Sequence, residues 1–516
     1  MKKKLTFMLC LLGISALAQP VIEWQQSLGG INYDVGYDIQ PTADGGYIAT
    51  GTTESANSGN VGNLQGAADC WLIKMDATGA IEWQRTLGGS DTDEAFSIRQ
   101  TSDGGYILGA HTNSNDGDVS GHHGNRDYWI VKMDATGAIE WQRALGGSGN
   151  ENFGSVVQTS DGGYFVSGLS NSNNGNVTGN HGQFDIWVLK LDQDGAIQWQ
   201  KTLGGSDFDS AADAIQTADG GFAIAGFSRS IDGDLSFSRG AEDVWIIKLT
   251  DTGAFEWSNT FGGNVIDVAT SIQQTSDGGY VTVGFTSSNN GDVSGNHGGS
   301  DYWVLKLGAT GDLEWQRTFG GTSSEICTVV RQTSDGGYIV GGHTNSNDGQ
   351  VTGYHGGDSD CWIVRLDPSG NLIWQKAIGG SGNDQMFAVE ETTEGGFVFA
   401  AFTTSIDGDV LGNQGGFDFW VVKLSSGITG VADSPSTLAG GISMFPNPTS
   451  GLFRISLEAG AIPVKAVLTE AGGKIVGSKT IDDSGYMDLS DLPGGVYFLT
   501  ITDLNDNRYW GKIVKE

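Results

Sequence analysis

Residues 83–89 read WQRTLGG and residues 141–147 read WQRALGG, so nearly the same seven letters occur twice, 58 residues apart. Similarity at a constant spacing is the signature of a repeat architecture. The tryptophan of this stretch recurs at Trp24, Trp83, Trp141, Trp199, Trp257, Trp315 and Trp374. A second series, in the pattern D-x-W, gives Trp71, Trp129, Trp187, Trp245, Trp303, Trp362 and Trp420. With Trp510 these account for all 15 tryptophans, so the composition reflects the repeat.

One repeat resolves into four short strands. AFSIRQT (95–101) and GYILGAHT (105–112) flank the turn SDGG, and DYWIVKM (127–133) and AIEWQRAL (138–145) flank DATG. Apolar–polar alternation on both sides of a glycine-containing turn indicates a β-hairpin, and no part of the unit has helical periodicity. Four strands in each of seven copies predict an all-β chain with a seven-bladed β-propeller.

The two ends of the repeat array support a closed ring. The first copy begins with VIEWQQSLGG (21–30), a fourth strand without the three before it, and the last copy stops at FDFWVVKL (417–424), which has no fourth strand. We expect the N-terminal strand to complete the last blade, which would leave no exposed sheet edge. The alternative, a solenoid, would need atypical capping repeats, and none is visible. The repeated Trp-Gln strand should be the outermost strand, with its indoles packed between blades.

Composition limits the class of partner. The chain of 516 residues has 83 glycines but 8 prolines, which suits many tight turns between strands. Its net charge of −34 would repel phosphate backbones, so we expect no nucleic-acid partner.

The N-terminus predicts export. MKKKLTFMLCLLGISALAQP has three lysines, an apolar run and a small-residue A-L-A ending at Ala18. This pattern is typical of a secretory signal peptide, here 1–18, with cleavage before Gln19. No other segment has the length of a membrane-spanning helix, so no transmembrane segment is expected after cleavage.

The repeat places its long connections on one side. Alternate connections of an antiparallel blade emerge on the same face, so SDGG and DATG share one face. The opposite face, called here the long-loop face, receives the link LGGSDTDEA (87–95) and the loop NSNDGDVSGHHGNR (113–126). Because function is usually carried by loops on a rigid scaffold, we expect any ligand to bind there.

An acid recurs at the start of the innermost strand. It is a candidate for a cation or cationic-ligand site at the mouth of the central channel, because seven carboxylates would converge there. The structural alternative is that each acid accepts hydrogen bonds from its own turn or a neighbouring blade, which avoids crowding unpaired like charges. The seven residues are Asp34, Asp93, Glu151, Asp209, Asp267, Glu325 and Asp384.

The long loops carry Asp/Asn clusters around glycine, such as NDGD at 115–118. Oxygen-rich clusters of this kind are what calcium prefers, although the glycine falls early and the terminal bidentate Glu of a calcium loop is missing. Asx turns explain the same composition without a metal. The candidate calcium ligands are Asp116, Asp118, Asp232, Asp234, Asp292, Asp348, Asp407 and Asp409.

No catalytic motif stands out. The sequence has no H-E-x-x-H, G-x-S-x-G or phosphate-binding glycine loop, and its carboxylates recur in every copy. All seven histidines lie in the repeats, and equivalent histidines on different blades would be too far apart to share a metal. An enzyme would need residues that one or two blades alone possess. The loop RSIDGDLSFSRGAED (229–243), with Arg229, Phe237 and Arg239, is the most divergent.

The repeat ends at residue 424, and its predicted span is 19–424. A small-residue stretch at 425–441 is typical of a flexible linker. Residues 442–516 contain strands of their own, including GLFRISLE, VKAVLTE and GVYFLTIT, which predict a small β-sandwich.

The C-terminal quarter resembles a known family. MFPNPTSG (444–451), DLPGGVYFLTIT (491–502) and the ending GKIVKE follow the order of motifs found in the type A sorting domain of type IX secretion cargo, a family of Bacteroidetes-type bacteria. The resemblance implies passage through the periplasm, contact with the type IX machinery, and secretion or display on the outer cell surface. It assigns the sorting motif to Pro446, Asn447, Pro448, Gly451, Gly494, Gly495, Tyr497 and Lys512.

These observations leave three hypotheses open. The first is a non-catalytic propeller that binds glycan or protein through its long-loop face, which the near-identity of the copies favours. The second is an extracellular hydrolase of polysaccharide, since cargo of this secretion system includes many hydrolases. The third is a structural spacer stabilised by calcium.

Overall fold

The computed structural model describes residues 19–235 and 238–426, and, further on, 442–445, 452–457, 463–470, 475–481, 486–493, 495–503 and 508–515. The chain divides into two compact units, 1–429 and 430–516, and each is described by itself. The predicted signal peptide and all but two residues of the predicted linker lie outside the described residues.

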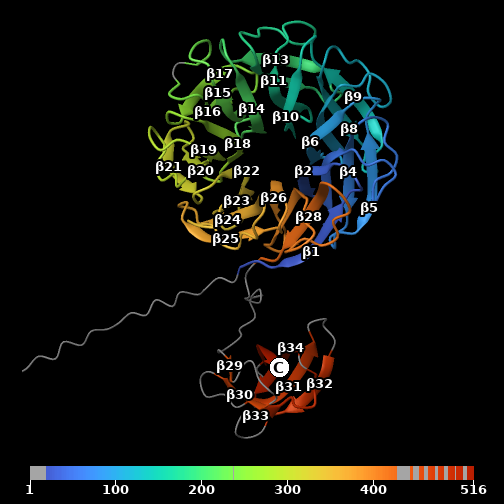
Figure 1. Ribbon diagram of the computed structural model, residues 1–516, viewed down its shortest axis with the longest axis vertical. Helices are drawn as coiled ribbons and strands as arrows, with labels where there is room; N and C mark the ends of the chain where they lie inside the picture. Colours follow the sequence, from blue (N-terminus) through green and yellow to red (C-terminus); the bar gives the residue numbers. More distant parts are fainter. Residues whose placement is uncertain are drawn as a thin grey trace, which may run out of the picture. The chain divides into compact units, whose positions relative to one another are not determined.

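The first unit is a seven-bladed β-propeller, which confirms the predicted fold. Seven four-stranded antiparallel sheets surround a central channel (Figure 1). Blades 1 to 6 each take four consecutive strands, innermost first: β2 (Asp34–Pro41), β3 (Tyr47–Thr53), β4 (Asp69–Met75) and β5 (Ile81–Leu87); β6 (Asp93–Gln100), β7 (Tyr106–Thr112), β8 (Asp127–Met133) and β9 (Ile139–Leu145); β10 (Glu151–Gln158), β11 (Tyr164–Ser170), β12 (Asp185–Leu191) and β13 (Ile197–Leu203); β14 (Asp209–Gln216), β15 (Phe222–Ser228), β16 (Asp243–Leu249) and β17 (Phe255–Phe261); β18 (Asp267–Gln274), β19 (Tyr280–Thr286), β20 (Asp301–Leu307) and β21 (Leu313–Phe319); β22 (Glu325–Gln332), β23 (Tyr338–Thr344), β24 (Asp360–Leu366) and β25 (Leu372–Ile378).

Blade 7 closes the ring as the sequence predicted. It consists of β26 (Asp384–Glu391), β27 (Phe397–Thr403), β28 (Asp418–Leu424) and, from the N-terminus, β1 (Ile22–Leu28), which pairs antiparallel with β28. The two strands lie side by side in Figure 1. The side chain of Gln25 adds to this pairing, because its Oε1 accepts hydrogen bonds from Trp420 Nε1 and from the backbone N–H of Leu411, both at 3.0 Å.

The second tryptophan series forms the centre of each blade. All seven D-x-W indoles are 0–1% exposed. Their N–H groups are satisfied across the hairpin by the glutamine of the Trp-Gln pair, as in Trp71 Nε1 to Gln84 Oε1 at 2.9 Å. Blade 4 is the exception, because Ser258 replaces the glutamine and Trp245 Nε1 makes no hydrogen bond within the described residues. The recurrent Trp-Gln pair therefore supplies an acceptor for a buried donor.

The first tryptophan series packs between blades, as expected. Each indole of the outermost strands meets the aromatic residue that begins the second strand of the next blade, with ring centroids 5.6–6.0 Å apart. Trp83 of blade 1 and Tyr106 of blade 2 are one such pair, in an edge-to-face arrangement at 5.8 Å. These half-buried rings serve packing, which leaves no row of open indole faces for stacking on sugars.

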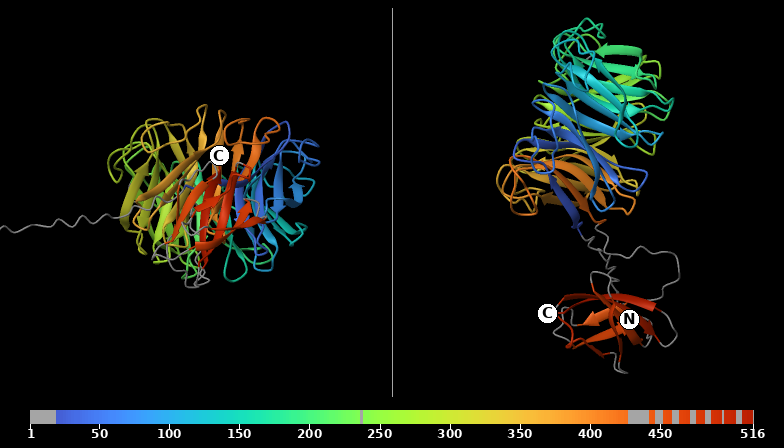
Figure 2. Two further views of the ribbon diagram at one scale, coloured as in Figure 1. Left: turned by 90° about the horizontal axis from the view of Figure 1, so that it is seen from below. Right: turned by 90° about the vertical axis from the view of Figure 1, so that its right-hand side faces the viewer.

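The loops leave the ring on both faces (Figure 2). A bulge in every innermost strand, such as that between Gly36 and Asp38 in β2, shifts the register against the second strand.

Parallel bridges join consecutive blades on the long-loop face, as between Ala68 and Thr92.

The second unit has two sheets, ordered β29-β30-β33 and β32-β31-β34-β35. Buried residues of both sheets, including Ile455, Leu468 and Leu499, share one core, as expected for a small β-sandwich. The strands are β29 (Ile442–Phe445), β30 (Leu452–Leu457), β31 (Pro463–Glu470), β32 (Ile475–Thr480), β33 (Tyr486–Asp488), β34 (Gly495–Asp503) and β35 (Arg508–Lys515).

The Trp–Gln contact gives a paired prediction. Gln84→Ser leaves the buried indole N–H of Trp71 without its acceptor, so we expect a loss of about 1–3 kcal/mol in the free energy of unfolding. Ser258→Gln should act in the opposite sense, because it supplies Trp245 with the acceptor that blade 4 lacks. Chemical denaturation of both variants checks this. Destabilisation by both substitutions would contradict the role assigned to the glutamine.

Candidate functional site

The predicted ring of acids lies beneath the long-loop face, inside the protein. All seven carboxylates are 0% exposed. Asp93 is typical: it accepts hydrogen bonds from the backbone N–H of Gly89 at 2.7 Å, from Ser114 Oγ at 2.8 Å and from the hydroxyl of Thr112. These contacts match the structural alternative weighed from the sequence, and a ligand at these acids stays a prediction. Equivalent contacts hold Asp34, Glu151, Asp209, Asp267, Glu325 and Asp384.

A second buried acid lies next to each of these. It is the aspartate of D-x-W, whose Oδ2 accepts a backbone N–H from a preceding residue, as in Gln65 N to Asp69 Oδ2 at 2.7 Å. In all seven blades its Oδ1 is buried and makes no hydrogen bond within the described residues. The residues are Asp69, Asp127, Asp185, Asp243, Asp301, Asp360 and Asp418.

The first glycine of L-G-G lies against both acids. A Cβ on Gly88 would stand 2.7 Å from Asp93 Oδ2 and 2.8 Å from Asp69 Oδ1. A larger residue has no space there, which explains why this glycine recurs. The two carboxylates of one junction are thus close neighbours, and like charges in a buried site raise each other's pKa.

Among the D-x-W acids, the pKa is raised most at the two junctions that blade 1 makes with its neighbours. Burial, with a smaller contribution from the charge of Asp93, raises the pKa of Asp69 to about 6. Burial likewise raises the pKa of Asp418 to about 6, with a contribution from Asp34. At both junctions the residue four positions earlier is a glutamine, Gln65 or Gln414, which brings no positive charge.

The Asp/Asn loops cap the links between blades. Asp116 Oδ1 accepts the backbone N–H of Ser90 at 2.7 Å, and Asp118 Oδ2 accepts that of Gly88 at 3.3 Å. The other predicted metal ligands make contacts of the same kind, and within the described ranges no group of three or more His, Cys, Asp and Glu side chains is gathered to hold a metal. Calcium binding by these loops stays a prediction. The aspartates with equivalent backbone contacts are Asp232, Asp234, Asp292, Asp348, Asp407 and Asp409.

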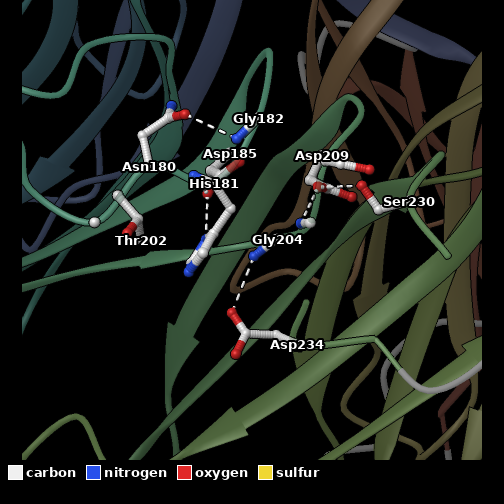
Figure 3. Close-up of polar contacts among 12 residues, drawn as sticks. Asn180, His181, Gly182, Asp185, Thr202, Gly204, Asp209, Ser230 and Asp234 are labelled. Carbon is white, nitrogen blue, oxygen red and sulfur yellow. Dashed lines mark hydrogen bonds and ion pairs between the residues drawn. The ribbon is translucent and has the colours of Figure 1, made fainter. Parts of the chain in front are cut away.

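Four histidines of the long loops are oriented by the D-x-W acids. The Nδ1 atoms of His123, His181, His297 and His355 lie 2.6–2.7 Å from Oδ2 of that acid, as Figure 3 shows for His181 and Asp185. At the equivalent position Gln65 reaches the next blade, where its Nε2 donates to Asp118 Oδ2 at 2.6 Å. Gln414 makes a similar contact with the next blade, from its Nε2 to Asn60 Oδ1 at 2.6 Å, so these two glutamines link the loops of neighbouring blades.

A groove opens on this face between blades 2 and 3. It has a volume of about 390 Å³. Its lining combines polar side chains, including Ser120, His123, Gln142 and Asn176, with the apolar Ala144 and Leu145. Gln142 and Arg143 are held in place, because Gln142 binds the indole of Trp129 at 2.8 Å and Arg143 lies 5.4 Å over the ring of Trp141. A ligand would meet a preformed polar surface.

The copies differ in the residues that line the central channel, which the sequence analysis did not single out. Tyr37 packs on Phe96 and Phe387, with ring centroids 4.9 and 5.0 Å apart, so three neighbouring blades form an aromatic wall. The other four blades carry small residues at this level, and the space beside the wall is about 110 Å³. The small residues are Gly154, Ala212, Thr270 and Thr328.

Charged residues of the channel are also unequal between blades. Arg99 forms an ion pair with Asp38, and Arg331 Nε lies 2.6 Å from Glu390 Oε1. Asp213 accepts hydrogen bonds from Ser271 Oγ and from the backbone N–H of Ile272, both at 3.1 Å, and burial raises its pKa. Alignment of the innermost strands of the seven copies reveals this asymmetry in the sequence, because equivalent positions carry different residues in different blades.

Part of the sorting motif is visible in the second unit. Tyr497 is buried, and its hydroxyl donates to the carbonyl of Pro493 at 2.8 Å. Gly495 and Lys512 lie in the paired strands β34 and β35. Outside the described residues are Phe237 of the divergent loop and Pro446, Asn447, Pro448, Gly451 and Gly494.

Comparison with protein families accounts for the second unit. Residues 443–516 match the family described as the secretion system C-terminal sorting domain. This confirms the resemblance found in the sequence: the chain is cargo of type IX secretion, with a repeat propeller ahead of its sorting domain. It is exported to the cell surface or the extracellular space.

A curated relative matches more of the chain. The regulatory protein FlaEY of Caulobacter vibrioides is 24% identical over 386 residues, which are 66% of this chain. The chain covers 39% of the length of that relative.

Two solved structures match much of the chain at low similarity. Sqt1 from Chaetomium thermophilum is 13% identical, with a TM-score of 0.40 over 85% of this chain and 97% of that one. The WD40 domain of Pan2 from Neurospora crassa is 12% identical, with a TM-score of 0.43 over 77% and 95%. Likeness at this level carries no argument about function.

Across the described ranges, no helix has the length and apolar character required to span a bilayer.

The buried acid pairs predict how stability depends on pH. Asp69 has a folded pKa of about 6, above the value of about 3.9 for an unfolded aspartate. Its contribution to stability is therefore present below about pH 4 and lost as the pH rises through about 6. Asp69→Asn removes this titration, and its amide can donate to Asp93. We expect the variant to gain about 2 kcal/mol over the wild type between pH 4 and pH 7.

Urea denaturation at several pH values measures this difference. Asp91→Asn, which removes an exposed acid from the link between the same two blades, controls for the change in net charge. A difference between Asp69→Asn and wild type that is constant over the pH range would refute the assignment.

The close approach of Gly88 gives a further prediction. Gly88→Ala places a Cβ within 3 Å of two buried carboxylates, so we expect a loss of about 1–3 kcal/mol in the free energy of unfolding. Gly62→Ala is the matched control, because a Cβ there has nothing within 4 Å. Thermal denaturation compares the two. Equal effects would show that Gly88 is retained for another reason.

Proposed function

We propose that this exported propeller is a non-catalytic binding protein that recognises glycan through its long-loop face. The observation that carries the proposal is the groove between blades 2 and 3, which is polar, preformed and lies on the face where the loops are longest. Recognition by a rigid surface loses little conformational entropy, which favours affinity.

The bracing of the loops supports the choice of face. Asp232 and Asp234 both accept backbone N–H groups of the link that precedes their blade, at 2.8 Å from Ser206 and 3.1 Å from Gly204. The same capping recurs around the ring, so the loops present a common rigid surface. The opposite face has only short turns, such as SDGG and DATG.

The chemistry of the groove favours a hydroxyl-rich ligand over a protein. His123, Gln142 and Asn176 offer planar donors and acceptors, the groups that fix the orientation of polar ligands. Protein interfaces instead centre on buried aromatic and aliphatic anchors.

The alternative of a polysaccharide hydrolase has less support. Glycosidases use two carboxyl groups that reach the scissile bond. The paired acids of this propeller are 0–1% exposed, and Glu390 of the channel is paired with Arg331. The spacer stabilised by calcium remains an alternative, while the name of the Caulobacter relative gives no ground for assigning regulation at 24% identity.

Blocking the groove tests the proposal. Ser120 is exposed at its edge, and Ser120→Tyr should fill it. On an array of bacterial, plant and animal glycans we expect saturable binding by the full-length chain, reduced at least tenfold in Ser120→Tyr because the ring occupies the space of the ligand.

Ala135→Tyr is the matched control, since Ala135 is exposed on the turn of the opposite face. Its glycan binding should equal that of the wild type. Loss of binding in Ala135→Tyr alone would move the site to the other face. Absence of binding to every glycan, together with release of reducing ends from a polysaccharide, would replace the proposal with the hydrolase.

A further inference from the structure

A repeated contact joins the innermost strands of neighbouring blades. At three junctions, a polar side chain of one strand accepts the backbone N–H of a residue in the next blade. The pairs are Ile98 N with Asp38 Oδ2 at 2.8 Å, Ala214 N with Ser155 Oγ at 3.0 Å and Ile272 N with Asp213 Oδ2 at 3.1 Å. Because the neutral hydroxyl of Ser155 makes this contact, the contact does not require an acid, and the charge of Asp213 needs another explanation.

Asp213 has no direct counter-ion. At the equivalent position of blade 1, Asp38 forms an ion pair with Arg99, the residue that follows its backbone donor. In blade 5 the corresponding residue is Gln273, which is uncharged. Across the described residues, no Lys, Arg or His nitrogen lies within 4.0 Å of an Asp213 oxygen. Blade 4 therefore places a carboxylate in the channel without the arginine that neutralises its counterpart in blade 1.

The arginines of the channel are already paired. Arg99 binds Asp38, and Arg331 Nε lies 2.6 Å from Glu390 Oε1. Burial raises the pKa of Asp213, and the charges of Arg331 and Arg99, which act from farther away, lower it. Among the residues that line the channel cavities, three acids stand against two arginines, so one negative charge is in excess.

Asp213 and the aromatic wall line the same cavity. Strand β14, which carries Asp213, lies across the channel from β2 and β26, which carry Tyr37 and Phe387 (Figure 1). The cavity volume of about 110 Å³ is several times the roughly 30 Å³ that one water molecule occupies in the liquid, so a small organic group has room there. The faces of aromatic rings carry negative potential and attract cations. Both sides of the cavity thus favour a positively charged ligand.

Solvent reaches this part of the channel. The side chains of Arg99 and Arg331 are 23% and 18% exposed. Together with Asp213 they also line a second cavity, of about 230 Å³, to which Gln40 and Gln273 contribute. A ligand can therefore reach Asp213, and the net charge of −34 concentrates cations around the protein.

We propose that the central channel binds a small organic ammonium ion, held between the carboxylate of Asp213 and the aromatic wall. Asp213 Oδ1 accepts the backbone N–H of Ala214 at 2.8 Å and retains a lone pair for an ammonium N–H. A bare metal ion would instead require several oxygen ligands, which the aromatic wall does not provide. The site is separate from the glycan groove, so each proposal can be refuted without the other.

Ligand-observed NMR measures the proposal directly. The full-length chain is titrated with isopropylammonium and, as a neutral analogue of the same shape, with isopropanol. We expect saturable binding of isopropylammonium with a dissociation constant on the order of 1 mM, as suits so small a ligand. Isopropanol should bind at least tenfold more weakly. Equal binding of the two compounds would overturn the proposal.

Two substitutions test the role of Asp213 with residues that other blades carry. Asp213→Ser reproduces Ser155, so it keeps an acceptor for Ile272 and removes the charge. Gln273→Arg reproduces Arg99, so it gives Asp213 an internal counter-ion and removes none of the hydrogen bonds of that carboxylate. We expect each substitution to weaken the binding of isopropylammonium at least tenfold.

Two further variants test the wall and the effect of added charge. Phe96→Leu keeps an apolar side chain but removes a ring face, so we expect about threefold weaker binding. Ala135→Arg adds a positive charge on an exposed turn away from the channel and should bind as the wild type does. Chemical denaturation shows that each variant is folded. Binding that is unchanged in Asp213→Ser and Gln273→Arg, or reduced equally in Ala135→Arg, would contradict the assigned site.

Discussion

The propeller depends on burying one indole ring per blade and giving its N–H an acceptor. The D-x-W tryptophan is sealed at the centre of its blade, and an unpaired donor there would cost stability in every copy. The outermost strand supplies the acceptor through the glutamine that follows its own tryptophan, while that tryptophan packs on the next blade. One dipeptide thus connects the interior of a blade with the contact between blades. This double role explains why Trp-Gln recurs with so little variation.

Much of the fold was predictable because local sequence patterns determine it. Alternating strands on either side of glycine turns gave the blades, and the phase of the first and last copies gave the closure by β1. The partner of the indole N–H was not foreseen, since Trp71 and Gln84 meet only once the hairpin is formed. The sequence identified the seven acids of the innermost strands as a set, but it did not reveal that they are buried. In particular, it does not show that the Gly89 N–H and the Ser114 hydroxyl donate hydrogen bonds to Asp93.

The candidate sites were harder to predict because most polar residues recur in every copy, so few of them stand out. Residues present in every copy, such as the acid pairs and their glycine, proved to hold blades together. Differences between copies lie elsewhere: in the aromatic wall of the channel and in Arg99 and Arg331. Such differences are single substitutions within otherwise similar repeats, so their grouping becomes apparent only when the ring brings distant blades together.

The strand that closes the ring has a consequence for biogenesis. Gln25 and Trp420 are 395 residues apart in the chain, so their contact closes a loop that includes nearly the whole propeller. The entropy of closing a loop grows with its length, and contacts between distant residues form late in folding. Strand β1 is synthesised before the seven blades and stays unpaired until β28 of the seventh blade has formed. A chain truncated before residue 424 retains two unpaired sheet edges. Such edges can pair with other chains and aggregate, and they are open to proteases. Only a propeller with all seven blades can pair β1 with β28, so ring closure distinguishes complete chains from truncated ones.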